Sequence, residues 1–254
     1  DKGRLYLYPC NSIEQFWKAK NPTPDIAGLK VVTSRLLALD NSILGPKDRA
    51  LFKKCRDILP PIQEGVRNGL NVILPYAGEQ NMKPRNSENP ELYTVHPFKM
   101  YGIGRPDLQK ALDTFAARRH RFYGCWAQDP VQAAMLGLSD TAREYVLACF
   151  RSREPEYKFP AFWRERNDYT PDQDNGGNGE YGLQNMLMQS VGRAIYLQPA
   201  LPENWSAFFK LHAPGGTTVT ARIKNGKVVE LKTSPEKRRA DVQDYSKVRR
   251  PPDA

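Results

Sequence analysis

Tyr169-Thr-Pro-Asp-Gln-Asp-Asn-Gly-Gly-Asn-Gly-Glu-Tyr-Gly182 leads directly into an apolar segment, and this junction decides the predicted fold. The stretch holds three carboxylates and four glycines. Glycine tolerates positive φ angles and lets a backbone approach a ligand closely, so acidic side chains on such a turn can face a cleft. Asp, Asn and Gly are also the ordinary residues of turns and helix caps. The stretch therefore predicts a loop before a last helix over about residues 180–190, and leaves open whether the loop is a sugar or metal site or a simple cap.

Helical periodicity also recurs through the residues that precede this loop. Two long loops, over about residues 74–95 and 152–179, interrupt the pattern, and loops of such length in compact domains are often functional. The spacing of apolar residues and the position of Pro46 at a helix start predict five further helices. They cover about residues 24–40, 46–58, 106–119, 127–138 and 140–151.

From Ala194 the apolar period changes to two, which is typical of strands. The predicted strands include residues 208–212, 217–224 and 227–233, and Asn225-Gly226 marks a hairpin between the last two. A two-residue loop would pair Ile223 with Val228 and then split the apolar face of the hairpin. We therefore predict a three-residue loop, which pairs Ala221 with Val229 and keeps that face continuous.

The composition bounds the class of protein. The 254 residues are 40% hydrophobic and 26% charged, as in one large or two small globular domains. No apolar run approaches the roughly 20 residues that span a bilayer. The first residues, Asp1-Lys-Gly-Arg, contain no initiator Met or signal peptide, so we expect a mature or truncated product. The four cysteines form no Cys-x-x-Cys pair, and neither a zinc site nor a disulfide framework is predicted.

The net charge of +10 raises the question of nucleic-acid binding. Residues 222–254 hold ten Lys/Arg against five Asp/Glu, and elsewhere the basic residues are scattered and form no stripe on one helix. We expect neither nucleic acid nor a membrane as a partner. The predicted organisation is a helical region over 1–193, an antiparallel β region over 194–235, and a basic, Pro-ended and solvated tail over 236–254.

Several short motifs follow one another in the order found in glycoside hydrolase family 95, which the chain resembles over about residues 3–233. The most specific are the two that follow the glycine-rich stretch. The others are a Pro-to-Glu segment near the N-terminus, a His before a Tyr-Gly pair, a Trp after Gly-Cys, and an Asp before the glycines. In order, these motifs are Pro9-Cys-Asn-Ser-Ile-Glu14, Val95-His96 before Met100-Tyr101-Gly102, Gly124-Cys-Trp126, Asp174, Asn185-Met-Leu-Met-Gln-Ser190, and Leu197-Gln-Pro-Ala-Leu-Pro-Glu-Asn-Trp205.

The resemblance implies the chemistry of inverting α-L-fucosidases and related enzymes, which are built on an (α/α)6 barrel. By this resemblance Glu14 is the general acid and Asp174 polarises the attacking water. A related group of larger, uncharacterised barrel proteins matches Asp172 instead, so both aspartates remain candidates. Inverting hydrolysis requires such a pair of carboxyl groups, one on each side of the scissile bond.

Five further residues are candidates for binding the sugar, each with a structural alternative. His96 can contact a sugar hydroxyl or be a satisfied core histidine. Trp126 can stack on a pyranose or pack in the interior, and Asp129 can bind sugar or cap the helix that it begins. Glu88 and Glu91, in the 74–95 loop, can recognise hydroxyl groups or remain solvated. No metal or cofactor is expected.

The predicted fold class is α+β: the C-terminal half of an (α/α)6 helical-hairpin barrel, followed by a small antiparallel β-sandwich portion. The chain departs from the family where Ile13 replaces a Pro and Cys10 a Ser, and it supplies about half of the twelve barrel helices. An N-terminal segment is therefore expected as a partner that completes the barrel. The resemblance implies a glycan substrate and a periplasmic or extracellular location. The alternative is a non-catalytic carbohydrate-binding remnant of such an enzyme.

Overall fold

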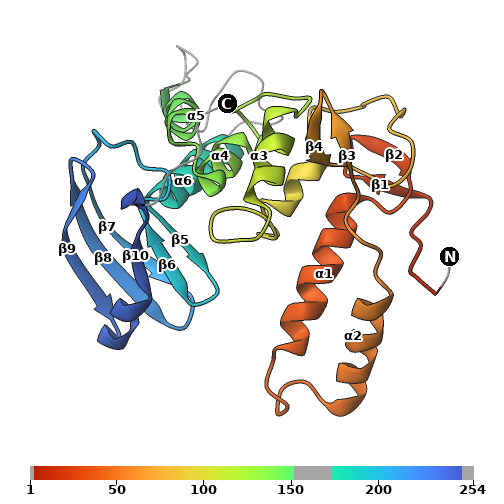
Figure 1. The fold of residues 1–254 in the computed structure, drawn as a ribbon, viewed down its shortest axis with the longest axis horizontal. Coiled ribbons are helices and arrows are strands. Elements are labelled where there is room, and N and C mark those ends of the chain that lie inside the picture. Colours follow the sequence, from red (N-terminus) through yellow and green to blue (C-terminus); the bar gives the residue numbers. More distant parts are fainter. Residues whose placement is uncertain (1–2, 152–172, 248–254) are drawn as a thin grey trace. The chain divides into compact units, whose positions relative to one another are not determined.

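The computed structural model of the chain describes residues 3–151 and 173–247 (Figure 1). These residues belong to two compact units. The first unit consists of Asp1–Tyr101 with Asp107–His120, and the second consists of Gly102–Pro106 with Arg121–Ala254. Each unit has its own buried core and is described separately below.

The first unit combines two β-hairpins with a pair of helices that contact each other. Proline begins both paired helices, because its fixed φ suits the first helical turn and its missing N–H is not needed there. A short 3-10 helix and one further helix follow the second hairpin. The elements are β1 (Cys10–Ser12), β2 (Phe16–Ala19), α1 (Thr23–Leu37), α2 (Pro46–Ile58), β3 (Glu64–Arg67), β4 (Leu70–Ile73), η1 (Pro90–Thr94) and α3 (Leu108–Ala116).

The β1–β2 hairpin is anchored to the chain that follows β4. The hydroxyl of Ser12, which is fully buried, donates to the backbone oxygen of Pro75 at 2.7 Å. The buried rings of Phe16 and Tyr76 meet edge to face, with centroids 5.1 Å apart. On the other side of β4, the N–H of Ile73 donates to the hydroxyl of Thr114 in α3 at 2.9 Å. The β1–β2 hairpin therefore packs against buried residues of the first unit.

The second unit contains three mutually contacting helices followed by two small sheets (Figure 1). Every residue of α4 is buried, since α5 and α6 both pack against it. One sheet has the strand order β10-β6-β5 and the other β7-β8-β9. The elements are α4 (Asp129–Leu136), α5 (Ser139–Arg151), α6 (Asp174–Leu187), β5 (Met188–Val191), β6 (Ala194–Leu197), β7 (Ala207–Ala213), β8 (Thr217–Lys224), β9 (Lys227–Ser234), η3 (Glu236–Asp241), β10 (Val242–Asp244) and η4 (Tyr245–Lys247).

A shared apolar core joins the two sheets of this unit. Ile195 and Leu197 from β6 pack with Val219, Ala221 and Ile223 from β8. These five side chains alternate along their strands with more exposed positions, as expected for strands buried on one face. One of the two sheets is mixed, because β10 runs parallel to β6. The parallel strand β10 lies beyond the predicted antiparallel region 194–235, in the segment predicted to be a tail.

The predicted half of an (α/α)6 barrel is wrong, although the α+β class is confirmed. In the described parts of the chain, four small sheets stand among the helices instead of a succession of helical hairpins. Residues 10–19 and 64–73 form β-hairpins that the sequence pattern did not predict. The apolar stripe of α1 also fails to behave as a barrel face, since Leu29 and Val32 are exposed. Periodicity predicts that a helix has an apolar face, but it does not identify what covers that face.

Residues 236–247 fold back onto the second unit and are not a solvated extension. The guanidinium group of Arg238 is buried, donates to the hydroxyl of Thr217 at 2.9 Å and to the backbone oxygen of Arg193 at 3.2 Å, and pairs with Asp241. The positive charge at this position therefore stabilises the fold and is not available to an external partner.

The β8–β9 hairpin has a two-residue loop, so the predicted three-residue loop is wrong. Asn225 and Gly226 both have positive φ, as a type I′ turn requires. Ile223 pairs with Val228, and a register shift beside that pair then places Ala221 opposite Leu231. The bulge leaves one extra residue on β9 and restores the continuous apolar face that motivated the wrong prediction.

Candidate functional site

The turn between β1 and β2 presents Glu14 to solvent. Ile13 adopts a left-handed conformation with φ of 54°, and the chain then turns Gln15 and Phe16 into the interior. Glu14 and Trp17 face outward, and the side chain of Trp17 is 50% exposed. The indole N–H of Trp17 donates to the backbone oxygen of Glu14 at 3.0 Å, which ties the ring to the turn.

The segment 85–88 of the predicted long loop holds this turn through its own backbone and side chains. The amide nitrogen of Asn86 donates to Glu14 Oε2 at 3.0 Å, and its backbone N–H donates to Gln15 Oε1 at 2.7 Å. The backbone N–H of Arg85 donates to the backbone oxygen of Gln15 at 3.0 Å. Gln15 in turn donates through Nε2 to the backbone oxygen of Glu88 at 2.9 Å. Four hydrogen bonds thus join two segments that are about 70 residues apart in sequence.

Glu88 supplies a second carboxyl group next to Glu14. The hydroxyl of Tyr93 donates to Glu88 Oε1 at 3.3 Å, while Oε2 is buried and has no hydrogen-bond partner. Burial raises the pKa of Glu88, and the charge of Glu14 raises it further. The hydroxyl of Tyr93 and the backbone N–H of Glu14 act in the opposite direction. Two carboxyl groups, one exposed and one half-buried, therefore share the turn, and neither forms an ion pair within the described residues.

His120 completes the polar surroundings of the turn, although no pattern in the sequence pointed to it. Its Nε2 lies 2.8 Å from Gln15 Nε2. Because the amide nitrogen can only donate, the histidine nitrogen accepts, which requires a neutral ring. Burial lowers the pKa of His120, and this agrees with the neutral form. The backbone of His120 is fixed by two hydrogen bonds to the side chain of Asn89, at 2.8 and 3.1 Å.

The other two candidates of this unit lie on or beside η1 and have internal environments. Glu91 is only 2% exposed and pairs with Arg67 at 2.7 Å. Its carboxylate is thus committed to an internal ion pair. His96 follows η1, where burial and the nearby charge of Lys99 lower its pKa to about 4. His96 is therefore neutral near pH 7.

Asp174 lies in the first turn of α6, in the second unit, and is exposed. A negative charge at this end of a helix complements the helix dipole. Two neighbouring side chains anchor the same turn: Asn175 donates to the backbone oxygen of Cys149 and Asn178 to that of Cys125, both at 3.0 Å. The second aspartate candidate, Asp172, lies outside the described residues.

The glycines before Leu183 belong to α6 itself, so the last helix begins at Asp174 and not near residue 180. Their role in the second unit is close helix packing. A Cβ at Gly179 would lie 2.9 Å from Cys149 Cβ in α5. A Cβ at Gly182 would lie 2.9 Å from Val146 Cγ2 and 3.3 Å from the backbone of Pro130. Gly177, by contrast, is exposed, and a Cβ added there would meet no other atom within 4 Å.

Two alanine substitutions in α6 are therefore expected to have opposite effects on stability. Gly177→Ala should raise the free energy of unfolding by about 0.5–1 kcal/mol, because alanine is the better helix former. Gly182→Ala should lower it by about 1–3 kcal/mol, because the new methyl group overpacks the contact with α4 and α5. Urea denaturation of both variants measures these changes. Equal effects of the two substitutions would contradict the packing role of Gly182.

Trp126 lies shortly before α4, and Asp129 is the first residue of that helix. Cys125 has a φ of 54° and turns the chain so that Trp126 is half-buried. Asp129 is buried as the first residue of α4, where its charge suits the helix dipole. Gln128 occupies the cap position of α4, so Asp129 lies one residue inside the helix.

The structure brings Glu14 and Glu88 together within the first unit. The predicted pair of Glu14 and Asp174 is divided between the two units, each of which is described alone. The residues that sequence reasoning missed around Glu14 are Gln15, Asn86, Tyr93 and His120. The only sequence signal for them was the polar 74–95 loop, whose partner could not be known before the fold.

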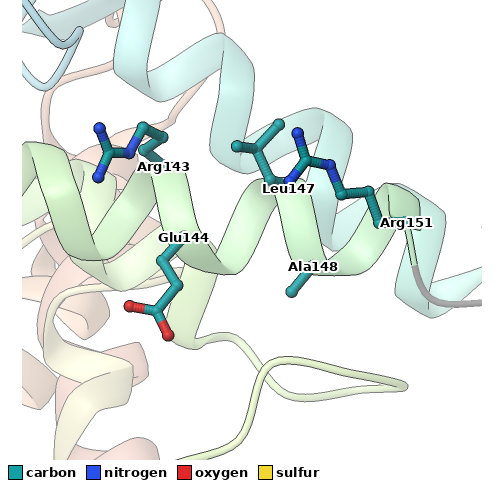
Figure 2. Close-up of a pocket in the computed structure, with 5 residues that line it drawn as sticks. All are labelled: Arg143, Glu144, Leu147, Ala148 and Arg151. Carbon is teal, nitrogen blue, oxygen red and sulfur yellow. The ribbon is translucent and has the colours of Figure 1, made fainter.

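A hollow of about 580 Å³ lies along α5 in the second unit (Figure 2). Figure 2 shows its five lining side chains on successive turns of that one helix. They are Arg143, Glu144, Leu147, Ala148 and Arg151. The hollow contains none of the residues predicted from the sequence to bind or cleave a sugar.

Within residues 3–151 and 173–247, no group of three or more His, Cys, Asp or Glu residues could hold a metal ion. No helix in those ranges is long and apolar enough to cross a membrane. No protein-family model matches the chain, and no curated protein sequence matches it.

Proposed function

We propose that the protein is a glycoside hydrolase in which Glu14 donates the proton to the leaving oxygen. The observation that carries this proposal is the meeting of Glu14 and Glu88 at one turn, in unequal environments and without a bonded cation within the described residues. A carboxyl group that is exposed, held by a hydrogen bond and without an ion pair can reach a substrate, as a general acid must. A carboxylate with a structural role, such as Glu91, is instead paired with a cationic side chain, here that of Arg67.

The surroundings of Glu14 fit a role that requires contact with substrate. Its carboxyl group is exposed, and a single side-chain donor, Asn86, fixes one of its oxygens. The exposed indole of Trp17 is bonded to the backbone of Glu14 and offers a flat apolar surface of the kind on which sugar rings stack. Acid catalysis by such a positioned carboxyl group contributes about 10²–10⁴-fold to a reaction rate.

The sequence resemblance refines this proposal to inverting hydrolysis of a terminal α-L-linked sugar in a glycan. Inversion needs a second carboxylate that activates water. Asp174 remains our proposed residue for that role, and its exposed position in the first turn of α6 leaves its carboxylate accessible. The side chains of Glu14 and Asp174 are both exposed, so both are suited to substitution.

A panel of aryl α-L- and α-D-glycosides tests the proposed activity. The whole chain should release the aryl group from at least one α-L-glycoside, and Asp174→Asn should abolish that release. Glu79→Gln is the matched control, since Glu79 is an exposed carboxylate in the same loop as Glu88 and lies apart from the turn. Release that is unchanged in Asp174→Asn would remove that residue from the mechanism.

Carbohydrate binding without hydrolysis is the second candidate, and the exposed aromatic residues of the first unit favour it. Tyr6 and Tyr8 are about half exposed, as is Trp17, and the two tyrosine rings lie 6.1 Å apart. If the protein only binds sugar, binding should survive Glu14→Gln and Asp174→Asn while no reducing sugar appears with any substrate. Isothermal titration with the same glycans distinguishes the two candidates.

A further inference from the structure

Glu88 contacts the turn between β1 and β2 through both its backbone oxygen and its carboxylate. Its backbone oxygen accepts the hydrogen bond from Gln15, the residue next to Glu14. Its carboxylate faces the backbone N–H of Glu14. Through both groups, Glu88 contacts the two residues that set the direction of the Glu14 side chain.

The charge environment of Glu88 is unusual for a carboxylate at such a position. The titratable groups that face it are Glu14 on the turn and Tyr93 on η1. Among the described residues, no cation contributes to the pKa shift of Glu88, and two arginines near the turn contact aromatic rings: Arg85 lies 4.5 Å from the ring centre of Trp17, and Arg119 lies 5.7 Å from that of Phe16. His120 is neutral and contacts Gln15. Ionised Glu88 thus faces another carboxylate, and its donors are the hydroxyl of Tyr93 and the backbone N–H of Glu14.

We propose that Glu88 is a positioning residue for Glu14, and that loss of its proton loosens the turn that carries Glu14. The proposal rests on the function proposed above for Glu14, but its structural part does not depend on activity. When Glu88 is neutral, the turn packs against a half-buried group without repulsion. When Glu88 ionises, a charge with a buried and unpartnered Oε2 atom is held beside Glu14. Both the repulsion and the cost of burying that charge then favour an opened turn.

The raised pKa of Glu88 determines how its contribution to folding stability changes with pH. Burial makes the pKa of Glu88 higher in the folded protein than its ordinary value of 4.5. The folded state therefore binds this proton more tightly than the unfolded chain does. The contribution of Glu88 to stability is therefore largest below about pH 4.5 and is lost as the pH rises through its raised pKa. Glu88→Gln, which is always neutral, should remove that fall.

Nuclear magnetic resonance of the whole chain between pH 4 and 8 tests the proposal without substrate. The backbone amide of Glu14 and the indole N–H of Trp17 should shift together, with one midpoint above 4.5. This shared transition should vanish in Glu88→Gln and remain in Glu79→Gln. A transition that persists unchanged in Glu88→Gln would overturn the proposal.

A second variant keeps the test valid if Glu88→Gln does not fold. Tyr93→Phe removes the hydroxyl that lowers the pKa of Glu88, so the midpoint should move to higher pH. A midpoint that stays fixed or falls would refute the assignment to Glu88. In active enzyme, Glu88→Gln should retain kcat at pH values where the wild-type kcat has declined. If no substrate is hydrolysed but the shared transition follows Glu88, the hydrolase proposal fails and the positioning proposal stands.

Discussion

Glu14→Gln is expected to lower kcat by about 10²–10⁴-fold while the fold is retained, because the amide cannot donate a proton to the leaving oxygen. The side chain of Glu14 is exposed, and the amide oxygen of Gln can still accept the hydrogen bond from Asn86. Binding of the substrate should change little, since the substitution removes an interaction that acts in the transition state. Steady-state kinetics on the best aryl glycoside measures kcat and KM separately.

The aryl leaving group offers an internal check on this result. Substrates with acidic leaving groups need less protonation, so the loss of kcat in Glu14→Gln should be smaller for a nitrophenyl glycoside than for the natural sugar linkage. Glu79→Gln should match the wild type with both substrates. A uniform loss that is independent of the leaving group would mean that Glu14 supports the structure of the site and does not donate the proton.

Glu91→Ala is expected to lower the free energy of unfolding by about 3–5 kcal/mol, because it leaves Arg67 buried without its carboxylate partner. Glu91 and Arg67 have side-chain exposures of only 2% and 15%, and their ion pair measures 2.7 Å. A second guanidinium nitrogen of Arg67, Nη2, is already buried without a hydrogen-bond partner. The loss should therefore be close to the full cost of an uncompensated buried charge.

The ion pair between Lys110 and Glu64 provides a matched control in the same unit. Its N–O distance is also 2.7 Å, but Glu64 is 45% exposed. Glu64→Ala should change the free energy of unfolding by about 0–1 kcal/mol, since solvent screens an exposed pair. Urea denaturation of both variants gives the comparison. Similar losses in the two variants would contradict the structural assignment of Glu91 and return it to the candidates for sugar binding.

Local sequence patterns predicted the α-helices and the strands β7, β8 and β9 of this chain, because each pattern depends on neighbouring residues alone. The helix over 46–58 matches α2, and the strand over 217–224 matches β8. In the hairpin between β8 and β9, these local patterns did not predict the length of the loop. The pattern correctly required a continuous apolar face, but the chain meets that requirement with a bulge after a two-residue loop. A bulge depends on how a strand fits its partner, which local periodicity does not contain.

The larger architecture could not be predicted, since it depends on which faces meet. The glycines of α6 were interpreted as loop residues because Asp, Asn and Gly are the ordinary residues of turns. Their helical placement follows from contacts with Val146 and Pro130, which admit no side chain at Gly182. Similarly, the exposed apolar residues of α1 produced a helical-hairpin pattern without specifying a barrel around it.

The candidate site was predicted in part. Glu14 and Glu88 were both named from the sequence, but as members of unrelated segments with different roles. Their meeting depends on Gln15, a buried polar residue whose side chain links the two segments. A buried glutamine that satisfies its hydrogen bonds across about 70 residues of chain has no local sequence signature.

Proton nuclear magnetic resonance of the released sugar tests whether Glu14 is the acid of an inverting hydrolysis. The whole chain is incubated with the best α-L-glycoside, and the anomeric proton of the product is followed from the first minutes, before mutarotation. The account predicts that the β-anomer appears first with the wild-type protein and that neither anomer appears at a comparable rate with Glu14→Gln. The account is contradicted if Glu14→Gln releases sugar as fast as the wild type, or if the wild-type protein hydrolyses no glycoside.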